Sequence, residues 1–359
     1  MTNDEIKEKY KMAKKYCCSD NIEDQEKAFN IFSELEEKYN DINARYYLGK
    51  MYYFGKYVKR NYEKAYEIFT RLEKENDDID AKYFLGQMYY HGQYVERNYE
   101  KAYTYFKELV EKYDMKNANY YLGEMYYFGK YVERNYEKAY EIFTRLEKEN
   151  DDIDAKAYLG QMYYLGRYVE KDYKKAYEYF KELKEKYDDK DAKYYLGRMY
   201  YFGQYVEQDY KKAYELFNEL VEKYNDKDAK IYLGEIYFFG KDIERNPKKA
   251  YELFKELVEE RDSKLAKAYI GVMYYYGDYL DVNYEKAYKI FSELAKTEME
   301  RKHELAYRMG KENLAKMYYY GQYVEQSYQK AYDIFKELVE KYNDKSAKEY
   351  LEKIENNVL

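Results

Sequence analysis

Apolar and polar positions follow one pattern along this chain, and the pattern returns every 37 residues. In residues 81–117, Ala81, Leu85 and Met88 recur at the spacing of one helix face. This helix ends before Gly92, a residue type that often closes helices in the left-handed conformation. The pattern therefore predicts a first helix, called helix A below, in each copy of the repeat.

A second amphipathic helix, helix B, follows after a short turn. Ala102, Phe106 and Leu109 mark its buried stripe. Asn98 precedes it, and its side chain can accept hydrogen bonds from the free N–H groups of a first helical turn. The same position holds a capping residue in each of the remaining copies, namely Asn61, Asn135, Asp172, Asp209, Asn246, Asn283 and Ser327.

The Leu-Gly glycine inside helix A sets the register of the whole chain. Glycine there costs about 0.5 to 1 kcal/mol relative to alanine, so we expect a close approach of a neighbouring helix that a side chain would block. The pattern predicts an all-α fold, an α/α solenoid of antiparallel helix pairs, because repeats of this length bury a core only against their neighbours. The register glycines are Gly49, Gly86, Gly123, Gly160, Gly197, Gly234 and Gly271.

The repeat also predicts how the chain is divided. We expect a single solenoid domain over residues 1–359, with polar ends that cap it and keep it monomeric. The spacing between the last two cap glycines is 44 residues, which indicates a seven-residue insertion around residues 296–311. Seven residues are close to two helical turns, so the insertion can lengthen helices and keep the buried face; a functional protrusion is the alternative. The parts are a degenerate N-terminal repeat (1–43), seven regular repeats (44–295), an eighth repeat with the insertion (296–344) and a C-terminal capping helix (345–359).

The repeat resembles a known family, the Sel-one-like repeats (SLR), a branch of the tetratricopeptide (TPR) superfamily. The resemblance implies a right-handed superhelix that organises protein complexes and has no catalysis of its own. Phe-x-x-Leu late in helix B departs from the Ala-Ala that family members often carry. In the fourth copy the matching residues are Ala155, Leu159, Gly160, Tyr163, Gly166, Val169, Asp172, Lys175 and Ala176.

Composition excludes several classes of function. The net charge is only -7, and charges of both signs alternate along the helices, which argues against nucleic-acid binding. No apolar run is long enough to span a membrane, and the start does not resemble a secretory signal. The two cysteines, Cys17 and Cys18, are adjacent and cannot staple distant helices. A cytoplasmic location is the simplest reading, with export without a cleaved signal peptide as the alternative.

Candidate chemistry is sparse, and we expect no enzyme activity, cofactor or metal. His91 and His303 lie in different repeats without a catalytic or metal-binding partner in the sequence. The acidic clusters at residues 77–80 and 188–191 lack the glycine and glutamate of a calcium loop. They lead directly into helix A, where carboxylates favour the helix N-terminus.

Sixty tyrosines are the remaining signal. The alanine at the start of each copy, Ala81 in residues 81–117, is called the repeat alanine, and positions in helix A are counted from it. On a helical wheel, positions two, six and nine after the repeat alanine form a separate stripe, in which position six is a variable polar residue and positions two and nine are mostly aromatic. Either these rings pack between adjacent repeats or they wall an exposed groove. The predicted partner-binding residues are Tyr46, Lys50, Tyr53, Tyr83, Gln87, Tyr90, Tyr120, Glu124, Tyr127, Gln161, Tyr164, Tyr194, Arg198, Tyr201 and Glu235.

These observations predict a non-enzymatic scaffold or adaptor that binds a protein or peptide partner on a concave, tyrosine-rich surface formed by helix A. The alternative is recognition of a glycan or cell-envelope polymer by stacking on the tyrosine ladder.

Overall fold

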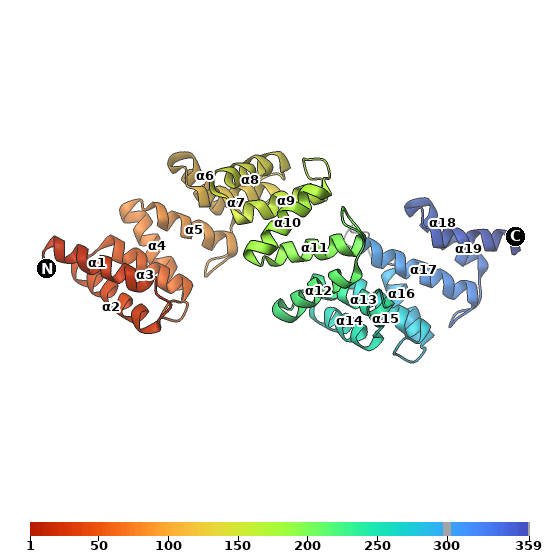
Figure 1. The fold of residues 1–359 in the computed structure, drawn as a ribbon. Helices are drawn as coiled ribbons and strands as arrows, with labels where there is room; N and C mark the ends of the chain where they lie inside the picture. Colours follow the sequence, from red (N-terminus) through yellow and green to blue (C-terminus); the bar gives the residue numbers. More distant parts are fainter. Residues whose placement is uncertain (297–302, 358–359) are drawn as a thin grey trace. The chain divides into compact units, whose positions relative to one another are not determined.

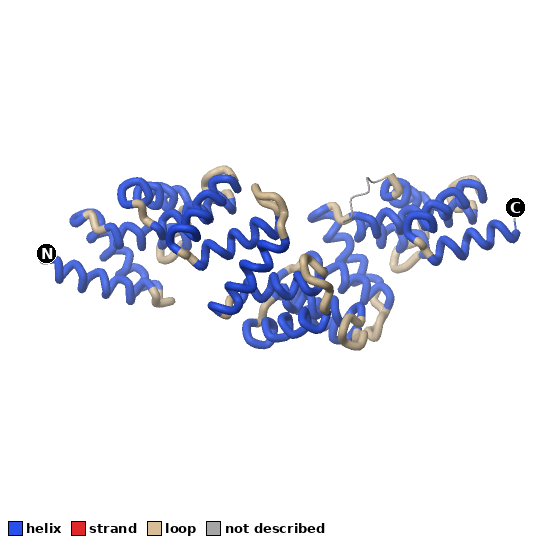
Figure 2. The backbone as a smooth tube through the Cα atoms, turned by 90° about the horizontal axis from the view of Figure 1, so that it is seen from above, coloured by secondary structure: helices blue, strands red, loops and turns tan. Residues whose placement is uncertain are grey.

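The computed structural model describes residues 1–296 and 303–357 (Figure 1). Within these residues the chain is helical, without strands, and short loops join consecutive helices (Figure 2). It divides into two compact units, Met1–Tyr179 and Phe180–Leu359, and the boundary falls inside α10. The all-α solenoid of helix pairs is thereby confirmed, whereas a single domain over the whole chain stays a prediction.

The first unit contains nine helices and the first half of α10, and consecutive helices in it pack against each other (Figure 1). Odd-numbered helices from α3 onward are the A helices, and even-numbered helices are the B helices. The bounds are α1 (Asn3–Cys17), α2 (Ile22–Tyr39), α3 (Ile42–Phe54), α4 (Tyr62–Asn76), α5 (Ile79–His91), α6 (Tyr99–Tyr113), α7 (Lys116–Phe128), α8 (Tyr136–Asn150), α9 (Ile153–Leu165) and α10 (Tyr173–Tyr187).

The second unit continues the alternation of A and B helices. Here α15 contacts α17 as well as α16. The bounds are α11 (Lys190–Phe202), α12 (Tyr210–Tyr224), α13 (Lys227–Phe239), α14 (Pro247–Arg261), α15 (Lys264–Tyr276), α16 (Tyr284–Leu294), α17 (Glu304–Tyr320), α18 (Tyr328–Tyr342) and α19 (Lys345–Asn357).

Local sequence explains where these helices begin and end. The Asn98 side chain accepts a hydrogen bond from the backbone N–H of Lys101 at 2.9 Å, which satisfies one free donor at the start of α6. Gly92 ends α5 with a φ of 70°, and Asp114 ends α6 with a φ of 48°, both in the left-handed region. The predicted roles of the capping slot and of the cap glycine are confirmed.

Replacing Asn98 with alanine should lower the free energy of unfolding by about 1 kcal/mol, because the backbone N–H of Lys101 loses its acceptor. Urea unfolding followed by circular dichroism measures the effect. Asn98→Asp is the matched control, since Asp172 and Asp209 occupy the same slot in other copies. Equal stability of the alanine and aspartate variants would contradict the capping role.

The core is built from one phenylalanine of helix B in each copy. Phe106 lies against the bare backbone of Gly86 in the same copy, where an added Cβ would be 2.8 Å from its Cε1. The Phe106 ring also stacks on Tyr121, three positions after the next repeat alanine, with ring centroids 4.5 Å apart. The close approach predicted from the helix A glycine is confirmed, and the same ring joins this copy to the next.

The insertion lengthens helix A of the eighth copy. α17 has 17 residues where the other A helices of the repeats have 13, and the preceding helix B, α16, has only 11. Gly310 occupies the slot of the repeat alanine, and Ala315 is buried in that of the packing glycine. Of the predicted inserted segment, residues 297–302 lie outside the described part of the chain.

Candidate partner-binding surface

Position nine of helix A is buried rather than exposed. The five predicted rings at this position are between 1% and 7% exposed, and burial raises the pKa of Tyr53 to about 12. The ring of Tyr90 lies 5.1 Å, centroid to centroid, from Tyr121 of the next copy. The rings at this position therefore pack between adjacent copies, the first of the two alternatives that the sequence leaves open, and Tyr201 also lines a cavity of the second unit. They are Tyr53, Tyr90, Tyr127, Tyr164 and Tyr201.

Position two is half-buried, and its tyrosines also bridge adjacent copies. Tyr83 lies 6.1 Å from the ring of Tyr121, and Tyr120 lies 6.2 Å from Tyr158. Burial raises the pKa of both Tyr83 and Tyr120. Each ring leaves only part of its surface open to a partner. The predicted tyrosines at this position are Tyr46, Tyr83, Tyr120 and Tyr194.

Position six links three successive A helices through hydrogen bonds. Gln87 accepts from the Tyr53 hydroxyl at 3.2 Å and donates to the Tyr121 hydroxyl at 3.0 Å. Glu124 accepts from Tyr90 at 2.9 Å and from Tyr158 at 2.6 Å. The variable polar residue is therefore engaged within the fold, which the helical wheel of one copy could not show.

The other predicted polar residues at position six also contact tyrosines. Gln161 accepts from the Tyr127 hydroxyl at 3.4 Å. The Lys50 ammonium lies 5.3 Å from the ring centroid of Tyr46, and the Arg198 guanidinium carbon lies 5.7 Å from that of Tyr194, both within the range of cation–π attraction.

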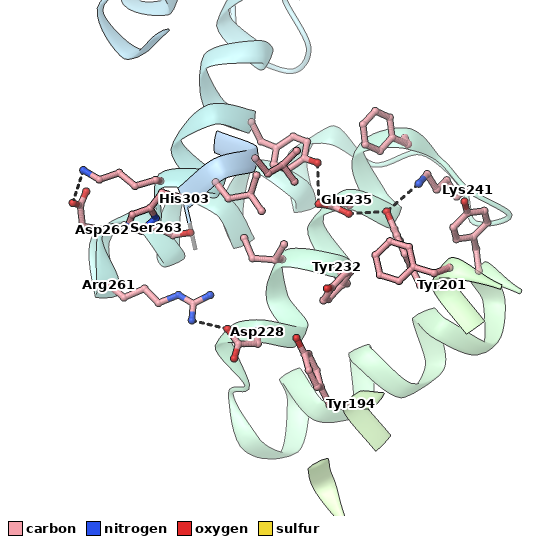
Figure 3. Close-up of a pocket in the computed structure, with 18 of the residues that line it drawn as sticks. Tyr194, Tyr201, Asp228, Tyr232, Glu235, Lys241, Arg261, Asp262, Ser263 and His303 are labelled. Carbon is pink, nitrogen blue, oxygen red and sulfur yellow. Dashed lines mark hydrogen bonds and ion pairs between the residues drawn. The ribbon is translucent and has the colours of Figure 1, made fainter. Parts of the chain in front are cut away.

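Glu235 is the most buried residue at position six. Its carboxylate accepts from Tyr201 at 2.6 Å and from Tyr269 at 2.8 Å (Figure 3). Lys241 donates to the same Tyr201 hydroxyl at 2.9 Å. Burial raises the pKa of the Glu235 carboxyl, and the two tyrosine hydrogen bonds act in the opposite direction.

A row of exposed aromatic residues of helix A lies at position ten, directly before the cap glycine. The aromatic rings there are 42% to 57% exposed and rest partly on the next copy; Phe128, for example, lies 6.1 Å from Tyr158. The sequence analysis did not predict this row. The aromatic residue that directly precedes the cap glycine in most copies could have indicated it. The row consists of Phe54, Phe128, Phe202, Phe239, Tyr276 and Tyr320, with His91 and Leu165 in the remaining copies.

A second exposed aromatic row lies in the loops between helix A and helix B. Tyr94 and Tyr131 are 54% and 55% exposed, and their hydroxyls donate to Glu63 and Glu100 of the preceding copy at 3.2 and 3.3 Å. These tyrosines have positive φ angles, 65° and 67°, an uncommon conformation for a bulky residue. The hydrogen bonds to the preceding copy give the row a structural role.

The second unit contains a cavity of about 850 Å³ between its A helices (Figure 3). Tyr194 and Tyr201 from α11 and Tyr232 and Glu235 from α13 form one side of it. Its other lining residues include Arg261, Leu265, His303 and Leu305, so the insertion contributes to the cavity. Glu235, at position six of the sixth copy, therefore lies beside this cavity.

The acidic clusters before helix A stabilise the fold. The Asp78 carboxylate accepts from the backbone N–H of Ala81 at 2.7 Å, and Asp77 forms an ion pair with Lys82, which is 4% exposed and also bonds Glu108 at 3.0 Å. In the described part of the chain, no group of three or more histidine, cysteine or acidic residues is arranged to hold a metal ion. Among the described helices, none is long and apolar enough to cross a membrane.

Antiparallel helix pairs that bury their core only between neighbouring copies define the class of helical repeat proteins. The chain belongs to the Sel1 repeat family. The family pattern, described as Sel1 repeat, matches eight segments: residues 42–77, 79–113, 116–151, 153–186, 190–223, 227–260, 264–296 and 303–343. Proteins of this family generally mediate protein–protein interactions and are generally non-catalytic scaffolds.

Solved structures show the same fold at low sequence identity. The protein c5321, a protective antigen of uropathogenic Escherichia coli strains with an SLR fold, is 20% identical, with a TM-score of 0.56 over 99% of this chain and 88% of that one. A Sel1 repeat protein from Oxalobacter formigenes is 22% identical, with a TM-score of 0.50 over 84% and 86%. A signal transduction ATPase with a tetratricopeptide repeat sensor from Pyrococcus horikoshii is 17% identical, with a TM-score of 0.51 over 99% and 55%. No curated protein matches the chain in sequence.

Proposed function

We propose that this protein is a non-enzymatic scaffold that binds a protein partner through the ends of its A helices. The observation that carries the proposal is the row of exposed aromatic rings at position ten. An exposed aromatic residue that recurs at one position in successive copies gives a repeated apolar surface, and aromatic residues are enriched where proteins bind one another. The half-buried tyrosines at position two supply further apolar surface on the same helices.

The sequence analysis predicts that the polar residues at position six bind the partner, whereas in this proposal they hold neighbouring copies together. Reversing the charge of Glu124 would break the hydrogen bonds from Tyr90 and Tyr158, so it would disturb the packing of three copies. Such a variant would not separate folding from binding. The test is therefore made at position ten, where the rings are exposed.

Two double variants test the surface in each unit separately: Phe54→Ser with Phe128→Ser, and Phe202→Ser with Phe239→Ser. Because aromatic anchors contribute much of the binding energy of an interface, each pair should reduce capture of the partner by about tenfold or more. Affinity capture from the native cell, followed by quantitative mass spectrometry, measures it.

The matched control is Tyr94→Ser with Tyr131→Ser, which removes two rings of the loop row that are at least as exposed as the position-ten rings replaced above. We expect this variant to retain the captured protein. If both position-ten variants capture the same proteins in the same amounts as the unaltered chain, while melting normally, the proposed surface is wrong.

The alternative of glycan recognition loses the feature on which it depended. The rings at position nine are buried and those at position two are half-buried, so neither presents a full face for a sugar to stack on. Protein binding is the function that the exposed row supports better. A monomeric state, a cytoplasmic location and the absence of nucleic-acid binding stay predictions from the sequence.

A further inference from the structure

The lysine, arginine and acidic side chains that line the cavity of the second unit are engaged with one another. Arg261 pairs with Asp228 at 2.8 Å, and Lys264 pairs with Asp262 at 3.1 Å (Figure 3). Both aspartate side chains are well exposed, so these two ion pairs lie on the solvent side of the cavity.

Glu235 and Lys241 meet through a shared hydroxyl group. Tyr201 donates to Glu235 at 2.6 Å and accepts from Lys241 at 2.9 Å. Burial raises the pKa of the Glu235 carboxyl, and the positive charge of Lys241 acts in the opposite direction. A charged ligand would have to displace pairings that already exist, so the cavity favours an uncharged one.

Three aliphatic side chains from three A helices line the same cavity: Ile231 from α13, Leu265 from α15 and Leu305 from α17. Ile231 is 8% exposed and Leu305 is 49% exposed, and no other leucine in the described part of the chain is as exposed. Covering such surface with an apolar group is favourable because the surface then leaves water. The cavity therefore has an apolar wall beside paired charges.

Two positions that are polar at regular junctions between copies are aliphatic here. At three junctions, position two is a tyrosine and the residue directly before the next repeat alanine is an aspartate. Burial, and then the negative charge of Asp80, raise the pKa of Tyr46, so the two side chains of such a pair lie close together. Ile231 and Leu265 take these positions where the sixth copy meets the seventh. The three regular pairs are Tyr46 with Asp80, Tyr120 with Asp154 and Tyr194 with Asp228.

We propose that this cavity holds a bulky apolar side chain, such as leucine, methionine or phenylalanine, that the protein partner presents. Anchor residues of an interface typically fill a pocket whose surrounding contacts exclude water and add little energy of their own. Phe202 and Phe239 of the position-ten row also line the cavity, so the anchor would continue the surface proposed above. The inference rests on the proposed scaffold function for the identity of the occupant.

A double variant gives this junction the residues of the regular ones. Ile231→Tyr with Leu265→Asp places a hydroxyl and a carboxylate where the two aliphatic side chains stand, a combination that three junctions already accommodate. Leu305→Ser removes the third aliphatic side chain at an exposed position, so it should fold even if the double variant does not. Ala157→Tyr is the matched control, because it adds a tyrosine at position two of the fourth copy, which does not line the cavity.

The probe is a phage-displayed library of random peptides, each twelve residues long, panned against the full chain. Enriched peptides are synthesised, and fluorescence anisotropy measures their dissociation constants. We expect them to share one apolar residue whose replacement by serine weakens binding by about tenfold or more, as burial of such a side chain predicts. The double variant should cause a similar loss, Leu305→Ser a smaller one, and Ala157→Tyr none.

The anchor of the peptide and the cavity should also act together. The serine-substituted peptide should bind the double variant no more weakly than it binds the parent chain, because the same contact is lost only once. Additive losses would overturn the inference, as would peptides without a shared apolar residue, no enriched peptide, or equal binding to the parent chain and to folded cavity variants. A dimer in analytical ultracentrifugation that Leu305→Ser dissociates would overturn it too, since the occupant would then be a second copy of the chain.

The position-ten variants separate this inference from the proposed function. Peptide binding that depends on the cavity, together with unchanged capture of native proteins by both position-ten variants, would refute the position-ten surface and keep the site. Peptides that bind without regard to the cavity, together with lost capture in Phe54→Ser with Phe128→Ser, would refute the cavity alone.

Discussion

Gly123→Leu is expected to lower the free energy of unfolding by about 3 kcal/mol or more, the upper range for an overpacked core. A Cβ atom at residue 123 would lie 2.7 Å from Cε1 and 2.9 Å from Cζ of Phe143, closer than carbon atoms approach without displacement. Phe143 is fully buried and stacks on Tyr158 at 4.6 Å, so its ring has no direction in which to retreat. The higher helix propensity of leucine, about 0.5 to 1 kcal/mol, offsets only part of this cost.

Urea unfolding monitored by circular dichroism measures the loss. The control is Glu141→Leu, which adds the same side chain on an exposed position of α8 and should change stability by less than about 0.5 kcal/mol. Gly123→Ala should fall between the two variants, because Ala315 is accommodated in the same slot of the eighth copy. An unfolding curve for Gly123→Leu that matches the parent would show that the glycine does not act through Phe143.

The capping and packing slots could be predicted from sequence because each depends on contacts within one copy. Asn98 bonds the first turn of the helix it precedes, and Gly86 meets Phe106 of the same copy. Both requirements recur unchanged along the chain, so a single copy contains the information that fixes them.

The surface could not be predicted in the same way, because its burial depends on the next copy. A helical wheel places Tyr90 on a stripe away from Ala81, but it cannot show that Tyr121 of the following helix A covers that stripe. In the sequence, Ile231 is likewise only one of several residue types that occur at position two. Its effect is visible only when Tyr269 and the first turn of α17 are placed around it.

The second large effect is expected when both hydroxyls that bond Glu235 are removed together. Tyr201→Phe with Tyr269→Phe leaves a carboxylate that is 7% exposed without its two donors. An unsatisfied buried acceptor costs about 1 to 3 kcal/mol, more for a charged one, so we expect a loss of about 3 kcal/mol at pH 7. The equivalent pair around Glu124, Tyr90→Phe with Tyr158→Phe, should cost less, because that carboxylate is only half-buried and water can replace the hydroxyls.

The loss should depend on pH with a defined sign. Burial raises the pKa of Glu235 in the folded chain above its ordinary value of 4.5, so the folded state holds this proton more tightly than the unfolded state. Its contribution to stability is therefore fully present below pH 4.5 and is lost as the pH rises through the folded-state pKa. The double variant removes the two hydrogen bonds that oppose this shift, so its stability should fall more steeply with rising pH than that of the parent chain.

Other charged groups line the same cavity and can also make stability depend on pH. A variant that lacks only the Glu235 carboxyl is therefore needed for comparison. Lys241 faces Glu235 from the loop after α13, and His303 and the ion pair of Arg261 with Asp228 lie around the cavity. Adding Glu235→Gln to the double variant removes the carboxyl and leaves these groups in place. Urea unfolding between pH 4 and pH 8 should then show the steeper dependence in the double variant and its loss in the triple variant. The same slope in both would assign the dependence to the surrounding charges, and Glu235 would have no part in it.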